Sequence, residues 1–415
     1  MSVRELEARI VEISADIEVQ KELVKQLERS KSAVQRQLNS LRDPMVRLPL
    51  EISSEIFLQC LYWNTHCPTP RSAPMLLMSI CIPWSEIALS NSVLWSTIRL
   101  NFPSAQILRL WLQRARNHAC SVTLERALNH VVANVLTEYS MRLKHLKIYD
   151  EDGVSSSALA AGGSFPSLET LTIGSVINDE EQLNTFSLND VIELLRLAPN
   201  LVECTLDTVY TYDDISAPTM LVLPNLTCMK SGRTLLEPAL LSHDDILFHL
   251  SLPALQTLFI PFNRISDADF LLFLERSSPP LQKLVIGADL SFSELDQYLR
   301  LLPSLKYLEL FTTSETFTND FFPALADSSA QFVPELRMLK IKHAIPDFVH
   351  ETLLPALFAR RTRLASFEFT ATHWRCRWSL DASVSDALGQ LAVGGMEIYI
   401  KGASGVFFKS SPDLA

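Results

Sequence analysis

Apolar residues recur at alternating steps of three and four along residues 3–42, the pattern of one narrow stripe on a long helix. Ten of the twelve stripe positions are apolar, and the two exceptions are Gln20 and Lys31. Proline and glycine are absent before Pro44, so the pattern predicts one helix of about 60 Å at 1.5 Å per residue. Residues 1–43 are therefore predicted to form a coiled-coil helix.

The residues at the stripe positions and beside them indicate which assembly this helix would form. Most first positions of the heptads are β-branched, which favours a parallel two-stranded assembly in which Asp16 and Lys21 could pair. Gln20 and Lys31 in the stripe lower stability but can fix the register. We expect a homodimer through residues 3–42; the alternative is a single helix folded back along its own protein.

The pattern of apolar residues and prolines over residues 44–100 predicts a set of short helices. Together these helices contain more large apolar residues than so small a module can bury. Ile52 and Ile56 lie one helical turn apart. Pro49 suits a first turn, where its missing N–H costs nothing, and Pro83 opens a later helix. An apolar surplus on the surface of a soluble protein commonly marks a docking site.

The order of the residues in this segment resembles an F-box. The resemblance rests on Leu48-Pro49-x-Glu51-Ile52, Ile56-Phe57, Trp84-x-x-Ile87-Ala88 and the closing Leu94-Trp95. It looks like the variant frequent in basidiomycete fungi, in which a heptad helix precedes the box. The resemblance implies a three-helix module that docks onto the Skp adaptor subunit of a cullin-RING ubiquitin ligase. The alternative is that the segment only caps the rest of the fold.

On the family pattern, the first half of the segment faces the adaptor, and its second half divides between the module's core and that surface. One departure concerns the residues before the tryptophan, which are usually basic in the family and are Cys81-Ile82-Pro83 here. The resemblance therefore implies the apolar part of the contact and leaves its electrostatic part open. The residues implied to bind the adaptor are Leu48, Pro49, Ile52, Ile56, Phe57, Leu61, Trp84, Ile87, Leu94 and Trp95.

A phrase of the form Leu-x-x-Leu-x-Leu/Ile recurs through residues 101–415. Successive copies start 24 to 33 residues apart, close to the roughly 20–29 residues of leucine-rich repeats. Helical patterns such as 188–197, 267–276 and 293–302 separate them, so each repeat is read as a strand followed by a helix. The lead residues are Leu143, Leu168, Leu201, Leu226, Leu255, Leu281, Leu305, Leu336 and Leu364.

This alternation predicts an α/β leucine-rich-repeat solenoid with strands on its concave side, preceded by the coiled-coil helix and the F-box. A helix over 104–116 and a strand over 121–124 are expected to form an irregular first unit. Residues 392–401 alternate as a closing strand, and 150–164 are expected to be a mobile insertion.

In each phrase the third and fifth residues point away from the core, because side chains alternate across a strand. Several of these residues are apolar, although they would face solvent, and charged residues surround them, as in an interface centre with a polar rim. Single exposed apolar residues are also common without any partner. The residues predicted to bind a protein substrate are Phe259, Lys283, Val285, Tyr307, Glu309, Met338 and Lys340. A second candidate, for acidic or phosphorylated segments, is the cluster Arg360, Arg361, Arg363, Trp374, Arg375, Arg377 and Trp378.

Composition narrows the classes of function. With a net charge of −11 and a pI near 5.4, the chain lacks the basic footprint that nucleic-acid binding needs. Seven cysteines without a C-x-x-C motif fit a reducing compartment, so cytoplasmic and/or nuclear localisation is expected. We expect no membrane span, because no apolar run approaches about 20 residues.

Catalytic and metal-binding motifs are absent from the sequence, which contains no G-x-S-x-G, no Gly-rich phosphate loop and no H-E-x-x-H. The chain is therefore predicted to be non-catalytic, without cofactor or metal. The resemblance to an F-box implies that it is a substrate-recognition subunit of a Skp–cullin–F-box ubiquitin ligase. The alternative is a leucine-rich-repeat scaffold that is not assembled into a ligase.

Overall fold

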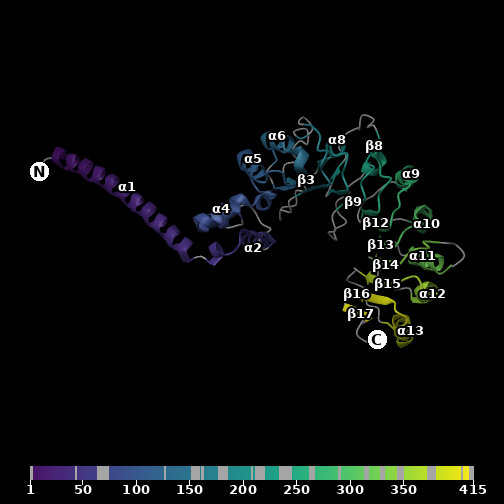
Figure 1. Cartoon of the computed structure of the whole chain (residues 1–415). Coiled ribbons are helices and arrows are strands. Elements are labelled where there is room, and N and C mark those ends of the chain that lie inside the picture. The colour runs from purple at the N-terminus through teal and green to yellow at the C-terminus, as the bar shows by residue number, and fades with distance from the viewer. Residues whose placement is uncertain are drawn as a thin grey trace. The chain divides into compact units, whose positions relative to one another are not determined.

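The chain divides into two compact units, which are described separately. Unit 1 comprises residues 1–100 and 106–120, and unit 2 comprises residues 101–105 and 121–415. Figure 1 shows the elements along the chain in a computed structural model. The residues that the structure describes are 3–42, 44–62, 74–125, 128–150, 159, 163–175, 186–206, 209–210, 220–232, 245–260, 267–287, 291–312, 317–327, 332–343, 350–371, 380–402 and 405–410.

Unit 1 begins with the predicted long helix, α1 (Val3–Arg42), which is confirmed as one uninterrupted helix. All of its described side chains are exposed. The apolar stripe of this helix is therefore exposed over its described residues.

The remainder of unit 1 consists of short elements punctuated by proline. The carbonyl of Pro49 accepts the backbone N–H groups of Ile52 and Ser53, so the proline lies where the first turn of α2 begins. Pro83 lies in the first turn of α4. The elements are η1 (Pro44–Arg47), α2 (Leu50–Tyr62), α3 (Met75–Ile80), α4 (Ile82–Ser90), η2 (Ser92–Trp95), β1 (Thr97–Leu100) and α5 (Ala105–Arg114).

Trp95 lies at the centre of the core of unit 1 and is fully buried. Its indole Nε1 donates to the carbonyl of Ala88 at 2.9 Å, so its one polar group is satisfied. The ring of Trp111 meets it edge-on with centroids 4.8 Å apart, and the guanidinium of Arg114 lies 4.4 Å from its ring centre. These contacts join η2 to α4 and α5.

Unit 2 is built on one long sheet whose strands follow the order of the chain from β2 to β17, with four short strands set aside in two small sheets. Neighbours from β3 to β16 pair in parallel, and β17 is antiparallel to β16. Besides β1, the strands of the long sheet are β2 (Cys120–Glu125), β3 (Leu143–Asp150), β4 (Thr170–Ser175), β6 (Glu203–Leu206), β9 (Cys228–Ser231), β11 (Thr257–Ile260), β12 (Lys283–Gly287), β13 (Tyr307–Thr312), β14 (Met338–His343), β15 (Ser366–Ala371), β16 (Glu397–Gly402) and β17 (Gly405–Lys409).

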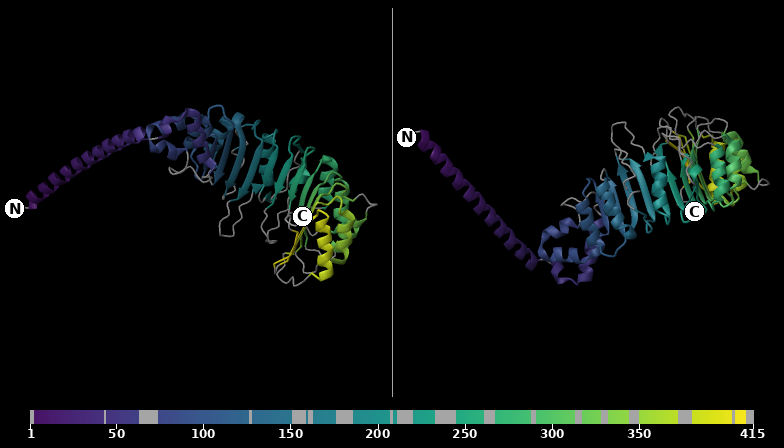
Figure 2. Two further views of the ribbon diagram at one scale, coloured as in Figure 1. Left: turned by 60° about the horizontal axis from the view of Figure 1, so that its bottom comes forward. Right: turned by 90° about the horizontal axis from the view of Figure 1, so that it is seen from above.

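A helix lies between β4 and β6 and between each successive pair of strands from β11 to β16, as a parallel pairing requires. Figure 1 shows α9 to α13 along the outer side of this unit and β12 to β17 along its inner side, and Figure 2 shows the strands side by side. The helices are α6 (His130–Glu138), α8 (Leu188–Leu197), α9 (Asp267–Ser277), α10 (Phe292–Arg300), α11 (Phe317–Ala326), α12 (His350–Arg360) and α13 (Ala382–Val393), with 3₁₀ turns η3 (Ser140–Arg142) and η4 (Asp245–His249). The two small parallel sheets pair β5 (Phe186–Ser187) with β7 (Val209–Tyr210) and β8 (Leu221–Val222) with β10 (Leu250–Ser251).

The repeated phrase explains how the sheet is buried on one side. The first, fourth and sixth residues of the phrase at 305 are Leu305, Leu308 and Leu310, and all three are buried. In the register Leu308 lies opposite Leu339, the fourth residue of the next phrase. Equivalent leucines therefore stack from strand to strand beneath the helices, as the alternation predicts.

Two arginines, the buried Arg360 and the half-buried Arg276, each tie a helix end to the repeat before it. Arg360, only 8% exposed, donates to the carbonyls of Leu325 and Phe332 at 2.8 and 2.6 Å. At the end of α9, Arg276 donates in the same way to the carbonyls of Leu247 and Leu250. These guanidiniums occupy carbonyls that turns between repeats would otherwise leave unpaired.

The structure corrects the prediction of a closing strand over residues 392–401. Helix α13 continues to Val393, and the strand begins only at Glu397. Gly395 takes a positive φ of 94°, which a glycine adopts without strain, and so reverses the chain after the helix. The strand is also not the last one, because β17 follows it. Most of the insertion predicted over 150–164 lies outside the described residues.

We expect Trp95→Ala to lower the free energy of unfolding of unit 1 by about 3–5 kcal/mol, because it removes a fully buried indole and leaves a cavity. Urea denaturation followed by circular dichroism measures the change. The matched control is Leu110→Ala on α5, whose side chain is 45% exposed and should cost less than about 1 kcal/mol. Equal losses in the two variants would contradict this description of the core.

Candidate functional site

The segment 44–100 carries an apolar surface, defined by ten large apolar side chains that are each more than a third exposed. They come from α2, α3 and α4 and from the segments that flank α2 and α4. This number is high for a module of this size, since exposed apolar residues are unremarkable only when scattered singly. The ten residues are Leu48, Leu50, Ile52, Ile56, Met75, Leu76, Ile80, Ile82, Leu89 and Val93.

Helix α2 divides its residues between this surface and the core. Ile52 and Ile56 are 50% and 40% exposed, whereas Ser53 and Phe57, one position further along, are fully buried. The hydroxyl of Ser53 donates to the carbonyl of Met45 at 3.2 Å. A serine thus lies in the buried stripe and two isoleucines lie in the exposed one.

The residues predicted to bind the adaptor separate into three groups. Phe57 is fully buried, so its prediction as a surface contact is wrong for this chain. Leu94 and Trp95 are also fully buried, so they belong to the part of the second half that lies in the core. The ring of Phe57 instead packs 5.0 Å from that of Trp84. The half-buried residues are Leu61, Trp84 and Ile87, and the exposed ones are Leu48, Pro49, Ile52 and Ile56.

The apolar surface includes residues that the sequence reasoning passed over, of which Ile82 is the most exposed, at 54%. It lies in the Cys81-Ile82-Pro83 stretch, whose cysteine is buried. Leu50, Met75 and the other residues added here belong to continuous runs of apolar residues. In such runs neither the helical nor the strand spacing of apolar residues shows which side chains are exposed.

The second candidate surface is the open face of the sheet in unit 2, formed by the third and fifth residues of the phrases. Register places these residues in two rows that cross the strands. From β6 to β15 the third-residue row runs Glu203, Cys228, Thr257, Lys283, Tyr307, Met338 and Ser366. The fifth-residue row runs Thr205, Lys230, Phe259, Val285, Glu309, Lys340 and Glu368.

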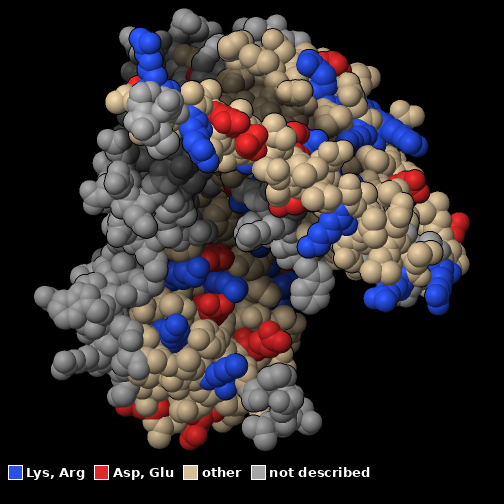
Figure 3. Space-filling model, turned by 90° about the vertical axis from the view of Figure 1, so that its left-hand side faces the viewer, with Lys and Arg blue, Asp and Glu red and all other residues tan. Residues whose placement is uncertain are grey.

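Oppositely charged side chains pair across neighbouring strands on this face. Lys340 Nζ lies 2.7 Å from Glu368 Oε2, and Lys342 Nζ lies 2.8 Å from Glu309 Oε1. The hydroxyl of Tyr307 donates to Glu309 Oε2 at 2.5 Å. In the view of Figure 3, blue basic groups likewise stand beside red acidic ones and do not form a wide area of one sign. The face therefore offers mixed charge to a partner.

Lysines also contact aromatic rings here. Lys283 Nζ lies 4.5 Å from the ring centre of Tyr307, and Lys342 Nζ lies 4.6 Å from that of Phe311. Such contacts hold the long lysine side chains over the rings. They order the surface between β12 and β14.

The carboxyl of Glu309 is the most enclosed charge in this network. Burial alone would raise its pKa, but hydrogen bonds from Lys342 and Tyr307 and the positive charges of Lys342 and Lys340 outweigh burial and lower the pKa. The pKa of Tyr307 is raised, first by burial and then by its hydrogen bond to Glu309. Near neutral pH the pair is thus a carboxylate that accepts from a neutral phenol.

The predicted substrate-binding residues are corrected at two positions. Val285 is fully buried, because Phe259 and Glu309 flank it in the same row and are longer. Glu309 is only 8% exposed and already paired. Phe259, Tyr307, Met338 and Lys340 are half-buried and Lys283 is exposed, so these five remain available for contact. The reasoning missed Lys342, although the same alternation, carried one step past the phrase, points to it.

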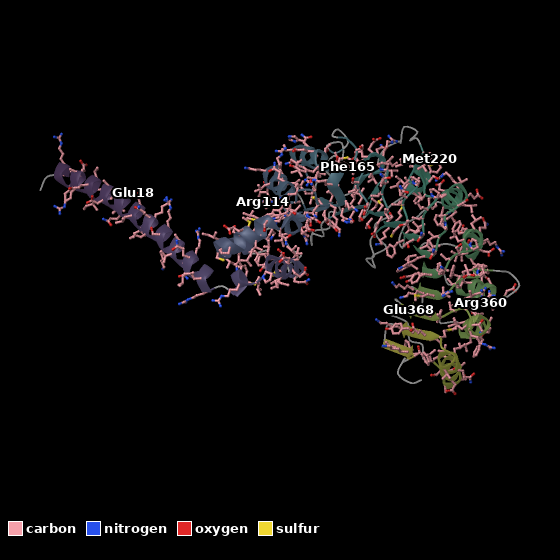
Figure 4. All side chains as sticks on the ribbon, in the orientation of Figure 1. Glu18, Arg114, Phe165, Met220, Arg360 and Glu368 are labelled. Atoms are coloured by element: carbon pink, nitrogen blue, oxygen red, sulfur yellow. The ribbon has the colours of Figure 1, made fainter. Side chains whose placement is uncertain are left out.

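Arg360 does not belong to the predicted arginine cluster on the surface, because its side chain points inward and donates to the two carbonyls described above. Figure 4 shows Arg360 on the helix side of unit 2 and Glu368 on its strand side. Arg361 and Arg363 are exposed. Trp374, Arg375, Arg377 and Trp378 lie outside the described residues.

Among the residues with a described position, no three His, Cys, Asp or Glu side chains come together as metal ligands. No helix in the described ranges combines the length and the apolar character that crossing a bilayer demands. The described cysteines, at 60, 81, 120, 204 and 228, are thiols that are not joined in disulfides.

Comparison with known proteins does not assign this chain to a family. No protein-family model matches it, and no curated protein is significantly similar to it in sequence. The two surfaces therefore have to be interpreted from their own residues.

We expect Glu309→Ala to lower the free energy of unfolding by about 1.5–3 kcal/mol, because two hydrogen bonds to a buried charge are lost. Thermal or urea denaturation measures it. The control is Glu368→Ala, whose pair with Lys340 is more exposed, at 26% and 29%, and should cost less than about 1 kcal/mol. A larger loss in the control would refute the central place of Glu309.

The effect of Glu309 should depend on pH. Its lowered pKa means that its contribution is present above the ordinary value of 4.5 and is lost as pH falls through the lower folded value. The stability difference between the wild type and Glu309→Gln, measured in urea, should therefore be largest near pH 7 and narrow below about pH 4. A difference that stayed constant down to pH 3 would contradict the lowered pKa.

Proposed function

We propose that this chain is the substrate-recognition subunit of a Skp–cullin–F-box ubiquitin ligase. Residues 44–100 would be its F-box, and residues 101–415 a leucine-rich-repeat solenoid that holds the substrate. The chain itself would be non-catalytic. Ubiquitin transfer would follow from proximity, because the substrate is held near a charged enzyme that other subunits supply.

The observation that carries this proposal is the apolar surface of residues 44–100. Its exposed residues Leu48, Ile52 and Ile56 belong to the motif that resembles an F-box, while Phe57 and Trp95 of the same motif form the core. An apolar surface beside a well-packed interior is the arrangement expected of a module that docks onto a partner.

The composition of this surface also bears on how the adaptor would be held. Where F-boxes usually carry basic residues, this chain exposes Ile82. The contact would therefore depend mainly on apolar burial, and its affinity would vary less with salt than that of a charged interface. Apolar burial would thus take the place of the electrostatic contact that the basic residues of the family pattern would make.

The open face of unit 2 is the proposed substrate surface. Phe259, Tyr307 and Met338 are half-buried among paired charges, which resembles an interface centre of aromatic and methionine side chains with a polar rim. Lys340 and Lys342 could bind an acidic ligand, but both are already paired with carboxylates of the chain itself. The face therefore favours a substrate segment of mixed charge with apolar anchors.

The alternative is a scaffold with the same repeats, in which residues 44–100 only cap the fold. A cap needs one apolar side, which packs against its neighbour. Ten further exposed apolar residues then have no role, so we prefer the ligase subunit.

The proposal predicts that the purified chain binds a Skp adaptor directly and that Ile52→Asp with Ile56→Asp weakens binding at least 30-fold, since hot-spot losses reach about 2 kcal/mol or more per residue. Isothermal titration or surface plasmon resonance measures the affinity. The matched control is Leu272→Asp with Leu301→Asp, two leucines 47% and 41% exposed at and near helices of unit 2, which should bind normally. Absence of binding by the wild type, or equal binding by both double variants, would rule out the F-box assignment.

A further inference from the structure

Helix α1 exposes a stripe of aliphatic side chains along its whole length. Ile10, Ile17 and Val24 at first heptad positions are 64%, 47% and 53% exposed, and the second positions Ile13 and Leu27 are 50% and 61% exposed. An isolated helix in water has no use for such a stripe, because most helical stability comes from packing an apolar face. The stripe therefore lacks the surface that it would pack against.

The stripe includes a shallow groove at the middle of the helix. It is lined by four stripe residues, with an acidic residue on one side and a basic residue on the other. The lining residues are Ile13, Asp16, Ile17, Gln20, Lys21 and Val24. This is the arrangement of a coiled-coil hole with its flanking charges.

We propose that a second copy of this chain fills the groove, so that residues 3–42 form a parallel, in-register, two-stranded coiled coil. In this arrangement Asp16 of each helix lies opposite Lys21 of the other, which gives two attractive pairs. Within its own helix Lys21 contacts Glu18 at 2.7 Å, but both side chains are about 70% exposed. Such a contact is weak and can be exchanged for the pair in the dimer.

The opposite orientation fits the charges less well. In an antiparallel pair that overlaps along its full length, the first heptad positions of one helix pack against the second heptad positions of the other. Lys21 would then lie beside Lys21 of the second copy, and Asp16 would lie beside Ser30 of the second copy. The parallel pair instead places Gln20 beside its own copy, where the two amides can bond, and Lys31 beside its own copy, where the charges can extend to solvent. The β-branched first positions favour the same choice.

The length of the stripe is sufficient for a stable dimer. A strip about 60 Å long and about 10 Å wide gives roughly 600 Å² per helix, or roughly 1,200 Å² for the pair, the lower bound of stable specific interfaces. A shorter stripe would fall below that bound. The dimer would need no contribution from the apolar surface of residues 44–100.

A dimer of this kind would present two copies of the open face of unit 2 and two apolar surfaces. A ligand with two recognition segments would then bind by avidity, because its second segment binds as an intramolecular step. This consequence rests on the proposed function, whereas the dimer itself does not.

Sedimentation equilibrium of the full chain without adaptor tests the dimer. The wild type should sediment at twice its mass of 46.7 kDa, and Ile17→Lys with Val24→Lys should sediment as a monomer. The matched control is Val11→Lys with Val19→Lys, which places the same charges on the same helix, outside the stripe, at residues 69% and 66% exposed, and should remain dimeric. A monomeric wild type, or two double variants that behave alike, would overturn the proposal.

A charge exchange tests the parallel register. Asp16→Lys alone and Lys21→Asp alone should each raise the dissociation constant of the dimer roughly tenfold, because each turns two attractive pairs into repulsive ones. The double exchange should restore it to within about threefold of the wild type. Single exchanges without effect, or a double exchange that does not restore binding, would refute the parallel arrangement.

Discussion

The parallel pairing of successive strands is the constraint on which both faces of unit 2 depend. Parallel neighbours cannot be joined by a tight turn, so each pair requires a connection that carries the chain back, and from β11 to β16 helices supply it. The alternation of side chains then assigns every residue of a strand to the helix side or the open side. Leu308 and Leu339 stack inside for the same reason that Glu309 and Lys340 lie beside each other outside.

The same constraint makes the open face more ordered than a list of its residues suggests. Because register aligns equivalent positions, the charges of Glu309, Lys340 and Glu368 lie side by side on three successive strands. Glu309 is enclosed by Tyr307 from its own strand and by Lys342 from its neighbour. The face is thus a preorganised surface, which lowers the entropic cost of binding a partner.

Much of this organisation could be predicted from the sequence. The long helix α1, the helix over 188–197 and the strands of the repeated phrase follow from periodicity alone, because burial on one side dictates the spacing of apolar residues. Helix α10 begins with a capping box between Ser291 and Glu294, a short-range signal. These features depend on residues close in sequence.

The errors share a cause, which is that burial depends on neighbours far along the chain. Phe57 and Ile56 are equally apolar and adjacent, and only the position of Trp84 shows which of them lies inside. Val285 follows the pattern of an exposed residue, yet longer residues on both neighbouring strands cover it. Arg360 seemed to belong to a surface cluster, but two carbonyls of the preceding repeat hold it inside.

The proposed function depends on the apolar surface of residues 44–100. The packing of unit 1 does not explain why these apolar side chains are exposed, whereas a docked adaptor would explain it. Hydrogen–deuterium exchange of the full chain, with and without a Skp adaptor, tests this claim most directly. The account predicts slower exchange of backbone amides in α2 and across α3 and α4 when the adaptor is present, with no change in the strands of unit 2. Unchanged exchange in α2, or slowing confined to the strands of unit 2, would contradict it.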